Sequence, residues 1–399
     1  MTAPKSIGPS RKVFSTEDAW RIAARRLPRL IFDFIEGSAG REVSAGRNVR
    51  RFDEIMLQPR VMADVAVRSV ATRLMGRTYG LPFGIAPMGM CNLSWPGADK
   101  YLAQAAKHYD VPVCLSSAAS SSIEEMYRWA GENTWFQLYV GQSMEHSLSL
   151  VDRAQAAGYE TLILTVDVPQ VSRRVRDLRN GFQVPFSIGP RQFIDFALHP
   201  RWSLTTLING PPSAKNFNAG NGVRFNRNGS RAGADWAFLD RLRNHWKGKL
   251  VVKGVTSADD ARRIRNSGAD AVYVSNHGGR QLDSAPPAID LLPIIRSAVG
   301  PDYPLIFDSG IRSGEDVVKA LALGADFVMI GRPMLFALAA EAEAGLNALF
   351  SAFAGDISTA MAQLGITTTD QITRQVLFPP PDQALTMQDS KLKMTSTST

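Results

Sequence analysis

The chain has 399 residues, of which 45% are hydrophobic and 21% are charged. These values are ordinary for a globular protein with a substantial core, and they exclude disorder of the whole chain. Its net charge of +8 permits binding to nucleic acid, to an anionic membrane surface or to an anionic ligand. Because the basic residues are scattered and no nucleic-acid-binding motif accompanies them, we expect no nucleic-acid partner.

The two cysteines, Cys91 and Cys114, are too few for a disulfide framework in a chain of this length. There is no CxxC pair or Cys/His cluster, so we expect no bound metal. Residues 1–13 lack the apolar core of a secretory signal, and no uninterrupted apolar run is long enough to cross a bilayer. We therefore expect a cytoplasmic protein, with a peripheral position on the inner face of the membrane as the alternative.

The first predicted element is a helical segment over residues 16–55. From residue 82 to 350, short apolar runs alternate with segments of helical periodicity, which is typical of repeated βα units. The eight expected strands are residues 82–88, 111–117, 135–140, 161–167, 250–254, 271–276, 305–308 and 327–330. Eight alternations predict a (β/α)8 barrel; an open doubly wound sheet is the alternative, but no GxGxxG follows the first strand.

The helices expected between these strands are residues 98–109, 122–130, 144–157, 235–246, 257–266, 288–298, 313–323 and 333 onward. Residues 169–234, rich in Gly, Asn, Arg and Pro, interrupt the repeats after the fourth strand. An insertion of this length is usually a lid, a binding loop or a disordered excursion. We expect a disordered tail at residues 385–399 and a single domain over residues 1–399.

Polar side chains gather at the carboxyl ends of the expected strands, where a barrel of this kind builds its active site. They are Ser116, Gln137, Tyr139, Thr165, Asp167, Lys253, Ser275, His277, Arg280, Asp308, Arg312 and Arg332. A charged or amide group is costly to bury there unless it is paired. Helix capping remains an alternative for Ser116 and Asp308, but the convergence of the whole set predicts a polar ligand.

Glycine followed by arginine comes after each of the last two strands, as Gly310 with Arg312 and Gly331 with Arg332. Small residues let backbone N–H groups approach a phosphate, and the arginines neutralise its charge. This pattern predicts a phosphorylated ligand and leaves the reaction open. His277 lies in a glycine-flanked turn after a buried strand, whereas we expect the other histidines to be solvated or locally packed: His108, His146, His199 and His245.

The sequence SNHGGRQLD at residues 275–283 resembles the signature of the FMN-dependent 2-hydroxy-acid oxidase and dehydrogenase family. Further stretches resemble the family in the same order: LP at 27–28, QLYV at 137–140, LTVD at 164–167, VKG at 252–254 and KALALGA at 319–325. The resemblance covers about residues 16–375. It implies a barrel that binds FMN and oxidises an L-2-hydroxy acid to the 2-keto acid.

The resemblance also implies a role for each substrate-facing residue. His277 would act as the base, and Asp167 would hold its imidazole and stabilise the charged form. Arg280 and Arg174 would bind the substrate carboxylate, for which a planar guanidinium is a fitting donor. Tyr139 would donate a hydrogen bond to a substrate oxygen.

For the cofactor, the resemblance implies that Lys253 stabilises the negative charge of the reduced flavin ring. The other residues expected at the ring are Ala86, Pro87, Met88, Ser116, Gln137, Thr165 and Ser275. Asp308 would hold the ribityl hydroxyls. The phosphate would be bound by Gly310, Arg312, Gly331 and Arg332.

Two positions depart from the usual pattern of the family. Phe34 stands where the family usually has a tyrosine whose hydroxyl helps to hold the substrate carboxylate; ordinary core packing is the alternative for Phe34. Ala118 stands where glycolate oxidases have a bulky tryptophan and mandelate dehydrogenases a small residue. More room at Ala118 predicts a substrate with a sizeable or aromatic side chain.

Residues 193–207 resemble the membrane-associating loop of bacterial relatives, and their aromatic, aliphatic and basic mixture suits an interfacial anchor. An active-site lid is the alternative. A membrane-bound enzyme would pass electrons to a quinone and a soluble one to oxygen; Gly89, expected near the flavin, does not decide between them. The resemblance also implies a homotetramer. An FMN-dependent barrel with another reaction, and a flavin or phosphate binder without turnover, remain as alternative functions.

Overall fold

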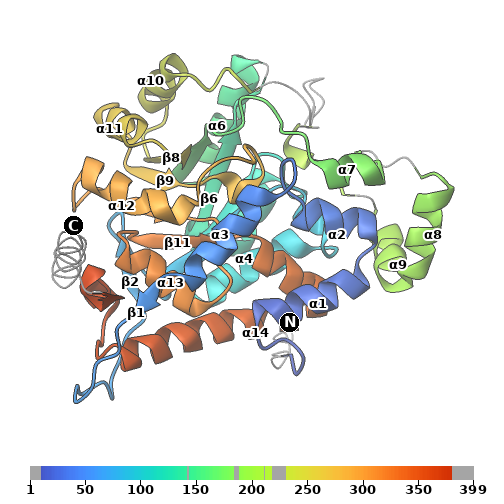
Figure 1. Ribbon diagram of the computed structural model, residues 1–399. Helices are drawn as coiled ribbons and strands as arrows, with labels where there is room; N and C mark the ends of the chain where they lie inside the picture. Colours follow the sequence, from blue (N-terminus) through green and yellow to red (C-terminus); the bar gives the residue numbers. More distant parts are fainter. Residues whose placement is uncertain (1–9, 142, 184–187, 211, 218–230, 380–399) are drawn as a thin grey trace, which may run out of the picture.

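The computed structural model describes residues 10–379 apart from residues 142, 184–187, 211 and 218–230, so the expected disordered tail lies outside the described residues. At its centre, eight parallel strands close into a barrel in the order β10-β11-β4-β5-β6-β7-β8-β9 (Figure 1). They are β4 (Phe83–Met88), β5 (Val113–Ser116), β6 (Thr134–Tyr139), β7 (Thr161–Thr165), β8 (Lys249–Val255), β9 (Ala271–Val274), β10 (Leu305–Phe307) and β11 (Phe327–Ile330). The predicted (β/α)8 barrel is confirmed.

Helices alternate with the strands because each apolar helix face covers the outside of the barrel. They are α4 (Ala98–His108), α5 (Ile123–Ala130), α6 (Met144–Ala157), α10 (Trp236–His245), α11 (Ala258–Asn266), α12 (Ala288–Val299), α13 (Gly314–Ala322) and α14 (Arg332–Gln363). Some of these helices begin with a side-chain cap: Ser122 and Glu125 form a reciprocal capping box at α5, and Ser313 and Asp316 form one at α13.

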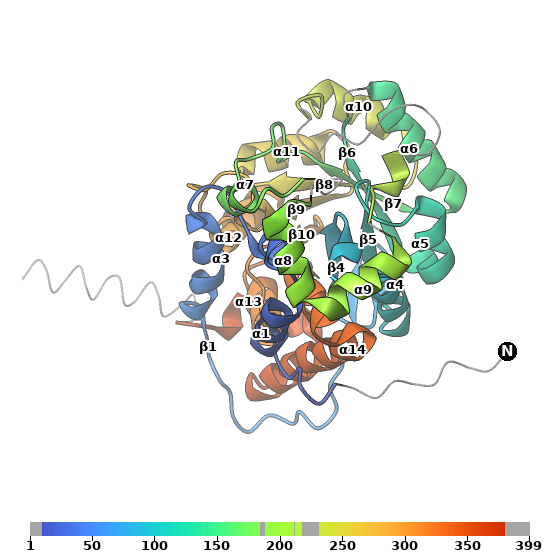
Figure 2. The same ribbon diagram turned by 90° about the vertical axis from the view of Figure 1, so that its right-hand side faces the viewer.

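Helix α14 is, within the described ranges, the one helix long and apolar enough to cross a membrane. Its most apolar stretch is 67% buried inside the fold, however, and it packs against α1, α13 and α4. These contacts identify α14 as a core helix. Figure 2 shows it lying along the lower edge of the molecule, beneath α1.

Three helices precede the barrel, as expected for residues 16–55: α1 (Thr16–Arg26), α2 (Arg29–Glu36) and α3 (Val43–Asp53). Short strands follow, with β1 (Met56–Leu57) paired to β12 (Leu377–Phe378), and β2 (Thr72–Leu74) paired to β3 (Arg77–Tyr79). Tyr79 packs against Trp135 and Phe327, at the starts of β6 and β11. The β2–β3 hairpin therefore closes the N-terminal end of the barrel and leaves the opposite end for a ligand.

The insertion after β7 contains α7 (Val175–Asn180), α8 (Pro190–Leu198) and α9 (Pro200–Asn209). The remaining short helical turns are η1 (Cys91–Leu93), η2 (Gly131–Asn133), η3 (Lys215–Phe217), η4 (His277–Gly279), η5 (Thr369–Gln371) and η6 (Arg374–Val376). The side chain of Asp195 accepts hydrogen bonds from the backbone N–H groups of Arg29 and Leu30, and Trp202 Nε1 donates to the Leu93 carbonyl at 2.8 Å. These bonds attach α8 and α9 to α2 and η1.

Candidate functional site

A single pocket lies among the C-terminal ends of the barrel strands and extends to α2 and to both ends of the insertion. Most residues that the sequence predicts for the site line it: Phe34, Ala86, Pro87, Met88, Ala118, Tyr139, Arg174, Lys253, His277, Arg280, Asp308, Gly310, Arg312, Gly331 and Arg332. Gly89 lines it as well. The structure thus brings together residues spread over 299 positions of sequence, from Phe34 to Arg332, in one cavity.

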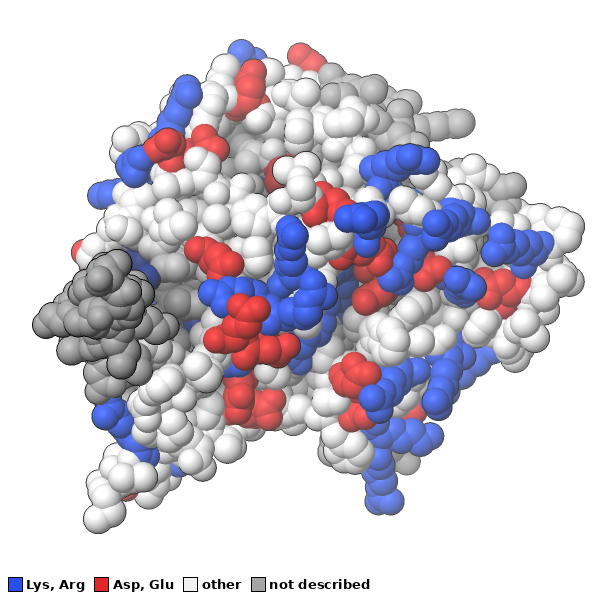
Figure 3. Space-filling model, viewed as in Figure 1, with Lys and Arg blue, Asp and Glu red and all other residues white. Residues whose placement is uncertain are grey.

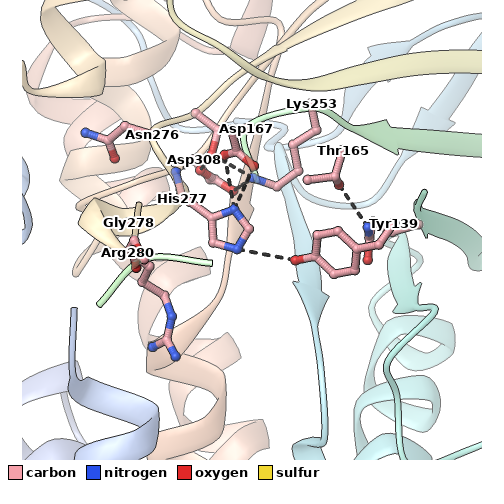
Figure 4. A network of polar contacts seen from close by, with 12 residues as sticks. Tyr139, Thr165, Asp167, Lys253, Asn276, His277, Gly278, Arg280 and Asp308 are labelled. Atoms are coloured by element: carbon pink, nitrogen blue, oxygen red, sulfur yellow. Dashed lines mark hydrogen bonds and ion pairs between the residues drawn. The ribbon is translucent and has the colours of Figure 1, made fainter. Parts of the chain in front are cut away.

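His277 sits at the centre of the polar network in Figure 4. Its Nδ1 lies 2.9 and 3.0 Å from the two carboxylate oxygens of Asp167, and its Nε2 lies 3.3 Å from the hydroxyl of Tyr139. Because the carboxylate accepts a hydrogen bond from Nδ1–H, the neutral imidazole keeps its lone pair on Nε2. Burial lowers the pKa of His277 below its ordinary value, although Asp167 opposes this shift. The unprotonated Nε2 is therefore ready to accept a proton.

The turn that carries His277 is unusual in its backbone. His277 itself has φ +58°, and Gly278 and Gly279 follow with φ +62° and +76°. A Cβ at Gly279 would lie 2.4 Å from the backbone nitrogen of Ala45, so only glycine fits there. Asn276 Oδ1 accepts hydrogen bonds from the Gly279 N–H and from Asn48 Nδ2, which holds the turn against α3. The strained conformation directs the imidazole into the pocket.

Asp167 is placed by close packing of the neighbouring strand. Gly254 on β8 has φ +100°, and a Cβ on it would lie 2.5 Å from the Cβ of Asp167. The pairing of β8 with β9 shifts register between Lys253 and Val255, at this same glycine. The irregularity in β8 therefore makes room for the carboxylate that holds His277.

Tyr139, at the end of β6, completes the polar group around His277 Nε2. Burial, followed by the charge of Asp167, raises the pKa of Tyr139 to about 12. The phenol consequently stays protonated at neutral pH and can donate its hydrogen to a bound oxygen atom.

Lys253 is a buried cation that lies between β8, β9 and β10. Its ammonium group lies 2.6 Å from the hydroxyl of Ser275 and 2.9 Å from a carboxylate oxygen of Asp308, which also accepts from Tyr273. Burial by itself would raise the pKa of Asp308, but Lys253 and these hydroxyls outweigh it and the pKa lies below its ordinary value. Lys253 and Asp308 thus form a buried ion pair on the pocket wall.

Three of the expected flavin-binding side chains form a row behind the pocket wall. Ser116 donates to Gln137 Oε1 at 2.8 Å, and Gln137 Nε2 donates to Thr165 at 2.9 Å. All three are buried at the ends of β5, β6 and β7. Their hydrogen bonds run from one strand end to the next and fix their order along the edge of the pocket.

Two half-buried arginines, Arg312 and Arg332, also line the pocket. Burial lowers the pKa of Arg312 below its ordinary value and that of Arg332 to about 10, although the charge of Glu36 opposes both shifts. Arg332 donates to the carbonyls of Ile35 and Gly278. Two cations whose charge is disfavoured by burial form a cradle that a dianionic phosphate would stabilise.

Arg280 and Arg174 lie at the mouth of the pocket beside α2. Arg280 donates from Nη1 to the carbonyls of Ile35 and Gly37, and from Nη2 to that of Phe34. These bonds use the C-terminal carbonyls of α2, which no helical N–H can reach, and they fix the plane of the guanidinium.

Phe34 and Ala118 form apolar parts of the wall. The ring of Phe34 stacks on Phe182 with centroids 4.2 Å apart and planes 5° apart, and the Arg280 guanidinium lies over it at 5.6 Å. Phe34 is therefore a partly buried pocket residue and is not confined to the core. Ala118 contributes only a methyl group at its position, which leaves the space beside it open.

Two charged residues of the site region are absent from the sequence prediction. Arg231, at the far end of the insertion, lies on the pocket wall, and Glu36 is close enough to Arg312 and Arg332 for its charge to raise the pKa of both. Arg231 follows a stretch without periodicity, so no pattern in the sequence indicates its position. Glu36 precedes Gly37 at the end of a helix. Its position in the sequence gives no sign that its charge acts on Arg312 and Arg332. Within the described residues, no group of His, Cys, Asp and Glu could hold a metal ion.

A proton acceptor and a basic cradle for a phosphorylated cofactor, in one barrel pocket, define a cofactor-dependent barrel enzyme. Residues 23–379 match the family described as FMN-dependent dehydrogenase, and the chain belongs to this family. It is accordingly an oxidoreductase with FMN as its cofactor, as the resemblance implied.

The similarity to individual proteins extends over most of the chain. The chain is 38% identical to (S)-mandelate dehydrogenase from Pseudomonas putida over 362 residues, which cover 89% of this chain and 91% of the relative. It is 36% identical to L-lactate dehydrogenase from Pseudomonas syringae pv. syringae (strain B728a) over 92% of this chain and 98% of the relative. A crystal structure described as monotopic membrane protein (S)-mandelate dehydrogenase superposes with a TM-score of 0.88 at 37% identity, covering 92% of this chain and 99% of that one.

Proposed function

We propose that the pocket oxidises 2-hydroxy acids with a sizeable, aromatic side chain to the corresponding 2-keto acids. The observation that carries this proposal is His277, whose Nδ1 is held by Asp167 while Nε2 faces the pocket beside Tyr139. Bound FMN supplies the acceptor for the two electrons that leave the substrate. The oxidation also releases two protons: His277 Nε2 takes one of them and Asp167 stabilises the imidazolium that results, while the second hydrogen would leave with the electrons to the bound FMN.

The substrate is oriented by its charged end. Arg280 and Arg174 bind the carboxylate, and the bonds from Arg280 to the carbonyls of α2 keep its guanidinium in a fixed plane. Tyr139 donates to a substrate oxygen, because its raised pKa keeps the phenol protonated. Since Phe34 has no hydroxyl group, the carboxylate is held by the two arginines without the tyrosine donor that is usual in the family.

The residues around the cofactor fit FMN by charge. Arg312 and Arg332 hold its phosphate, with Gly310 and Gly331 allowing close approach. Asp308 would accept hydrogen bonds from the ribityl hydroxyls. Ser116, Gln137, Thr165 and Ser275, with the backbone of residues 86–88, would hold the ring, and the positive charge of Lys253 would favour its reduction.

The size of the substrate side chain follows from Ala118. The position holds only a methyl group, and the pocket lining includes further apolar residues such as Val168 and Val171. A relative named (S)-mandelate dehydrogenase, at 38% identity, supports an aromatic substrate. Another relative, named L-lactate dehydrogenase, is 36% identical, so small 2-hydroxy acids must be assayed as well.

We also propose that α8 and α9 place the enzyme on the inner surface of a membrane. Phe193, Leu207 and Ile208 expose 66%, 79% and 83% of their surface, and Ile194, Leu198 and Leu204 are exposed beside them. In Figure 3 the right-hand tip, where Figure 1 places α8 and α9, is mostly uncharged, with basic side chains and some acidic ones next to it. Apolar side chains that are flanked by basic side chains suit the interface of an anionic bilayer.

None of the described residues of α8 and α9 lines the pocket, so the structure gives no support to an active-site lid at residues 193–207. A crystal structure described as a monotopic membrane protein superposes on this chain, which supports the membrane proposal. Electrons would then pass to a membrane quinone, with oxygen as the alternative acceptor. We further propose a homotetramer, which light scattering of the detergent-solubilised protein would test.

Anaerobic titration of the purified holoenzyme with a panel of 2-hydroxy acids tests the reaction. We expect (S)-mandelate to bleach the flavin absorption faster than L-lactate or glycolate. A flavin that no 2-hydroxy acid bleaches would favour a barrel with another reaction, and a protein without flavin absorption would favour a phosphate binder. Reoxidation by air or by a soluble quinone then identifies the acceptor.

A further inference from the structure

The short helix α7 follows directly on Arg174, one of the two arginines proposed to bind the substrate carboxylate. Arg174 is the N-cap residue of α7, and its carbonyl accepts the backbone N–H of Leu178 at 3.1 Å. A helix of six residues has little stability of its own, so contacts with the rest of the fold set its position. The position of α7 therefore decides where the backbone of Arg174 lies.

Apolar packing explains little of this position. Leu178 exposes 60% of its surface, and Asp177 is the one fully buried residue of α7. The ring of Phe182, two residues beyond the helix, stacks on Phe34 of α2 and so attaches the C-terminal end of α7. The first turn of α7, which is next to Arg174, is held by polar contacts.

Arg176, in this first turn, contacts two carboxylates. Its Nη1 lies 3.4 Å from Oδ1 of Asp33 on α2, and its Nη2 donates to Oε2 of Glu42, the N-cap residue of α3. Asn180, at the end of α7, donates from Nδ2 to the other carboxylate oxygen of Asp33 at 2.7 Å. These three contacts attach both ends of α7 to the segment that runs from α2 to α3.

The same segment also holds Arg280, the second arginine proposed for the substrate carboxylate. The carbonyls of Ile35 and Gly37 accept from Arg280, and a Cβ on Gly37 would lie 3.7 Å from the Cβ of Arg176. Helix α2 packs against α7, and Figure 1 shows the two side by side. The spacing between Arg174 and Arg280 consequently depends on how α7 is attached to α2.

We propose that Arg176, bound by Asp33 and Glu42, is a positioning residue that keeps Arg174 in place to bind the substrate carboxylate. This inference rests on the proposed function, because it assumes that Arg174 and Arg280 bind that carboxylate. The side chains of Asp33 and Glu42 are only 12% and 24% exposed, so water and salt screen these ion pairs less than pairs on an open surface. Loss of Arg176 weakens binding of the carboxylate and leaves the proton transfer unchanged.

Binding of the product separates this role from a purely structural one. In Arg176→Gln we expect the dissociation constant of benzoylformate, the keto acid formed from mandelate, to rise by roughly three- to tenfold. The flavin difference spectrum of the oxidised holoenzyme measures it. KM for (S)-mandelate and for L-lactate should rise by the same factor, because both substrates have the carboxylate, while kcat stays within about twofold of wild type.

Two further variants test the ion pairs themselves. Arg176→Lys keeps a positive charge without the planar group, so its dissociation constant should lie between those of the wild type and Arg176→Gln. Glu42→Gln removes a charge but keeps the oxygen that accepts from the Ser38 N–H. It should weaken binding by itself and have no further effect in the Arg176→Gln background. Effects of the two replacements that simply add would overturn the proposal.

Arg153→Gln is the matched control. Arg153 on α6 forms an ion pair with Glu124 on α5 at 3.0 Å, and its side chain is 30% exposed, compared with 36% for Arg176. Neither residue of this pair lines the pocket. The dissociation constant of benzoylformate should keep its wild-type value in Arg153→Gln. An equal rise in this variant would show a long-range effect of net charge and would overturn the proposal.

Two other results of the Arg176→Gln experiment would overturn it. The first is an unchanged dissociation constant. The second is a loss of kcat or of bound FMN without weaker binding of benzoylformate, because Arg176 would then only support the fold. Failure of the proposed function gives a different result: no 2-hydroxy acid would bleach the flavin of the wild-type holoenzyme, whereas that bleaching persists if only the role of Arg176 is wrong.

Discussion

Proteins usually bury apolar side chains and expose polar ones. The strand ends of the barrel bury polar side chains instead, whereas α8 and α9 expose apolar ones. At the strand ends, Lys253, Asp308 and Gln137 are polar groups removed from water, and each has a hydrogen-bond or ionic partner. On α8 and α9, large apolar side chains such as Phe193 and Leu207 face outward. Polar groups are buried without a large cost only when they are paired, and exposed apolar groups leave part of the hydrophobic effect unused. The first arrangement suits a polar ligand inside the barrel, and the second suits an apolar surface outside it.

If this comparison is correct, the two regions can be disrupted separately. The largest effect should come from His277→Gln, which removes the base and leaves the cradle of arginines intact. We expect kcat to fall by about 10⁴-fold, the upper end of the contribution of a positioned base. Stopped-flow bleaching of the flavin measures the loss, and the ratio of flavin to protein absorbance should stay at the wild-type value. An activity within tenfold of wild type would exclude His277 as the base.

The complementary experiment disrupts the apolar region alone. The triple replacement Phe193→Ser, Leu198→Ser and Leu207→Ser removes three exposed apolar groups and none of the pocket. Since burial of one such side chain contributes about 1.5–3 kcal/mol, binding to anionic vesicles should weaken by roughly 10²-fold or more. Vesicle sedimentation measures this binding. Matched serine replacements at the exposed Val61, Met62 and Val67, outside the insertion, should leave vesicle binding unchanged.

The apolar part of the pocket can be filled without touching its polar part. Ala118→Trp should lower kcat/KM for (S)-mandelate by about 10²-fold, because a forced overlap in a packed wall costs roughly 1–3 kcal/mol. Activity on glycolate should persist. Equal activity on (S)-mandelate in the variant and the wild type would show that the side chain lies elsewhere in the pocket.

Restoring a polar group to the wall should have a smaller effect. Phe34→Tyr adds a hydroxyl group that can donate to the substrate carboxylate beside Arg280 and Arg174. One further hydrogen bond to the substrate corresponds to roughly a two- to tenfold lower KM. Steady-state kinetics with (S)-mandelate measures it. Phe182→Tyr, on the ring that stacks on Phe34, is a control for an added hydroxyl group. An unchanged KM in Phe34→Tyr would mean that the carboxylate does not approach Phe34.

The smallest effect concerns pH. Burial lowers the pKa of His277, so the neutral base persists below its ordinary pKa of about 6.5. The value of kcat/KM should therefore stay above half of its plateau value at pH 6.5 and fall to half only at the lowered pKa. Asp167→Asn removes a group that raises this pKa, so its acidic limb should move to lower pH while its plateau falls. A limb that moves to higher pH would contradict the contact between Asp167 and His277.

The sequence predicts the barrel well for a physical reason. Strands of a parallel barrel are buried on both faces, so they stand out as apolar runs, and all eight runs became strands within a few residues of the predicted bounds. The polar residues that end these runs could be assigned to one pocket because strand ends of a barrel meet at one edge. His277 and Lys253 are predictable in this way.

Contacts between distant segments could not be predicted. Nothing local indicates that Asn48 holds the turn of His277, or that the carbonyls of α2 fix Arg280. The sequence analysis predicts a long insertion but no helices at α8 and α9. Pro190 and Pro200, which stand at the first helical positions where proline is common, are the sequence signal that could have indicated them. Arg231 lies beyond any periodic pattern, and only the folded chain places it beside Tyr139.

The hydrogen bond from the backbone N–H of Arg231 to the carbonyl of Pro169, at 3.0 Å, has a consequence for how this protein can evolve. It joins the two ends of the insertion at its base, so α8 and α9, which lie between these ends and contribute no described residue to the pocket, could be exchanged or lengthened while the barrel keeps its geometry. The proposed attachment to a surface could then change independently of the chemistry in the barrel. Arg231, which closes the insertion, is constrained by the barrel because it also forms part of the pocket wall.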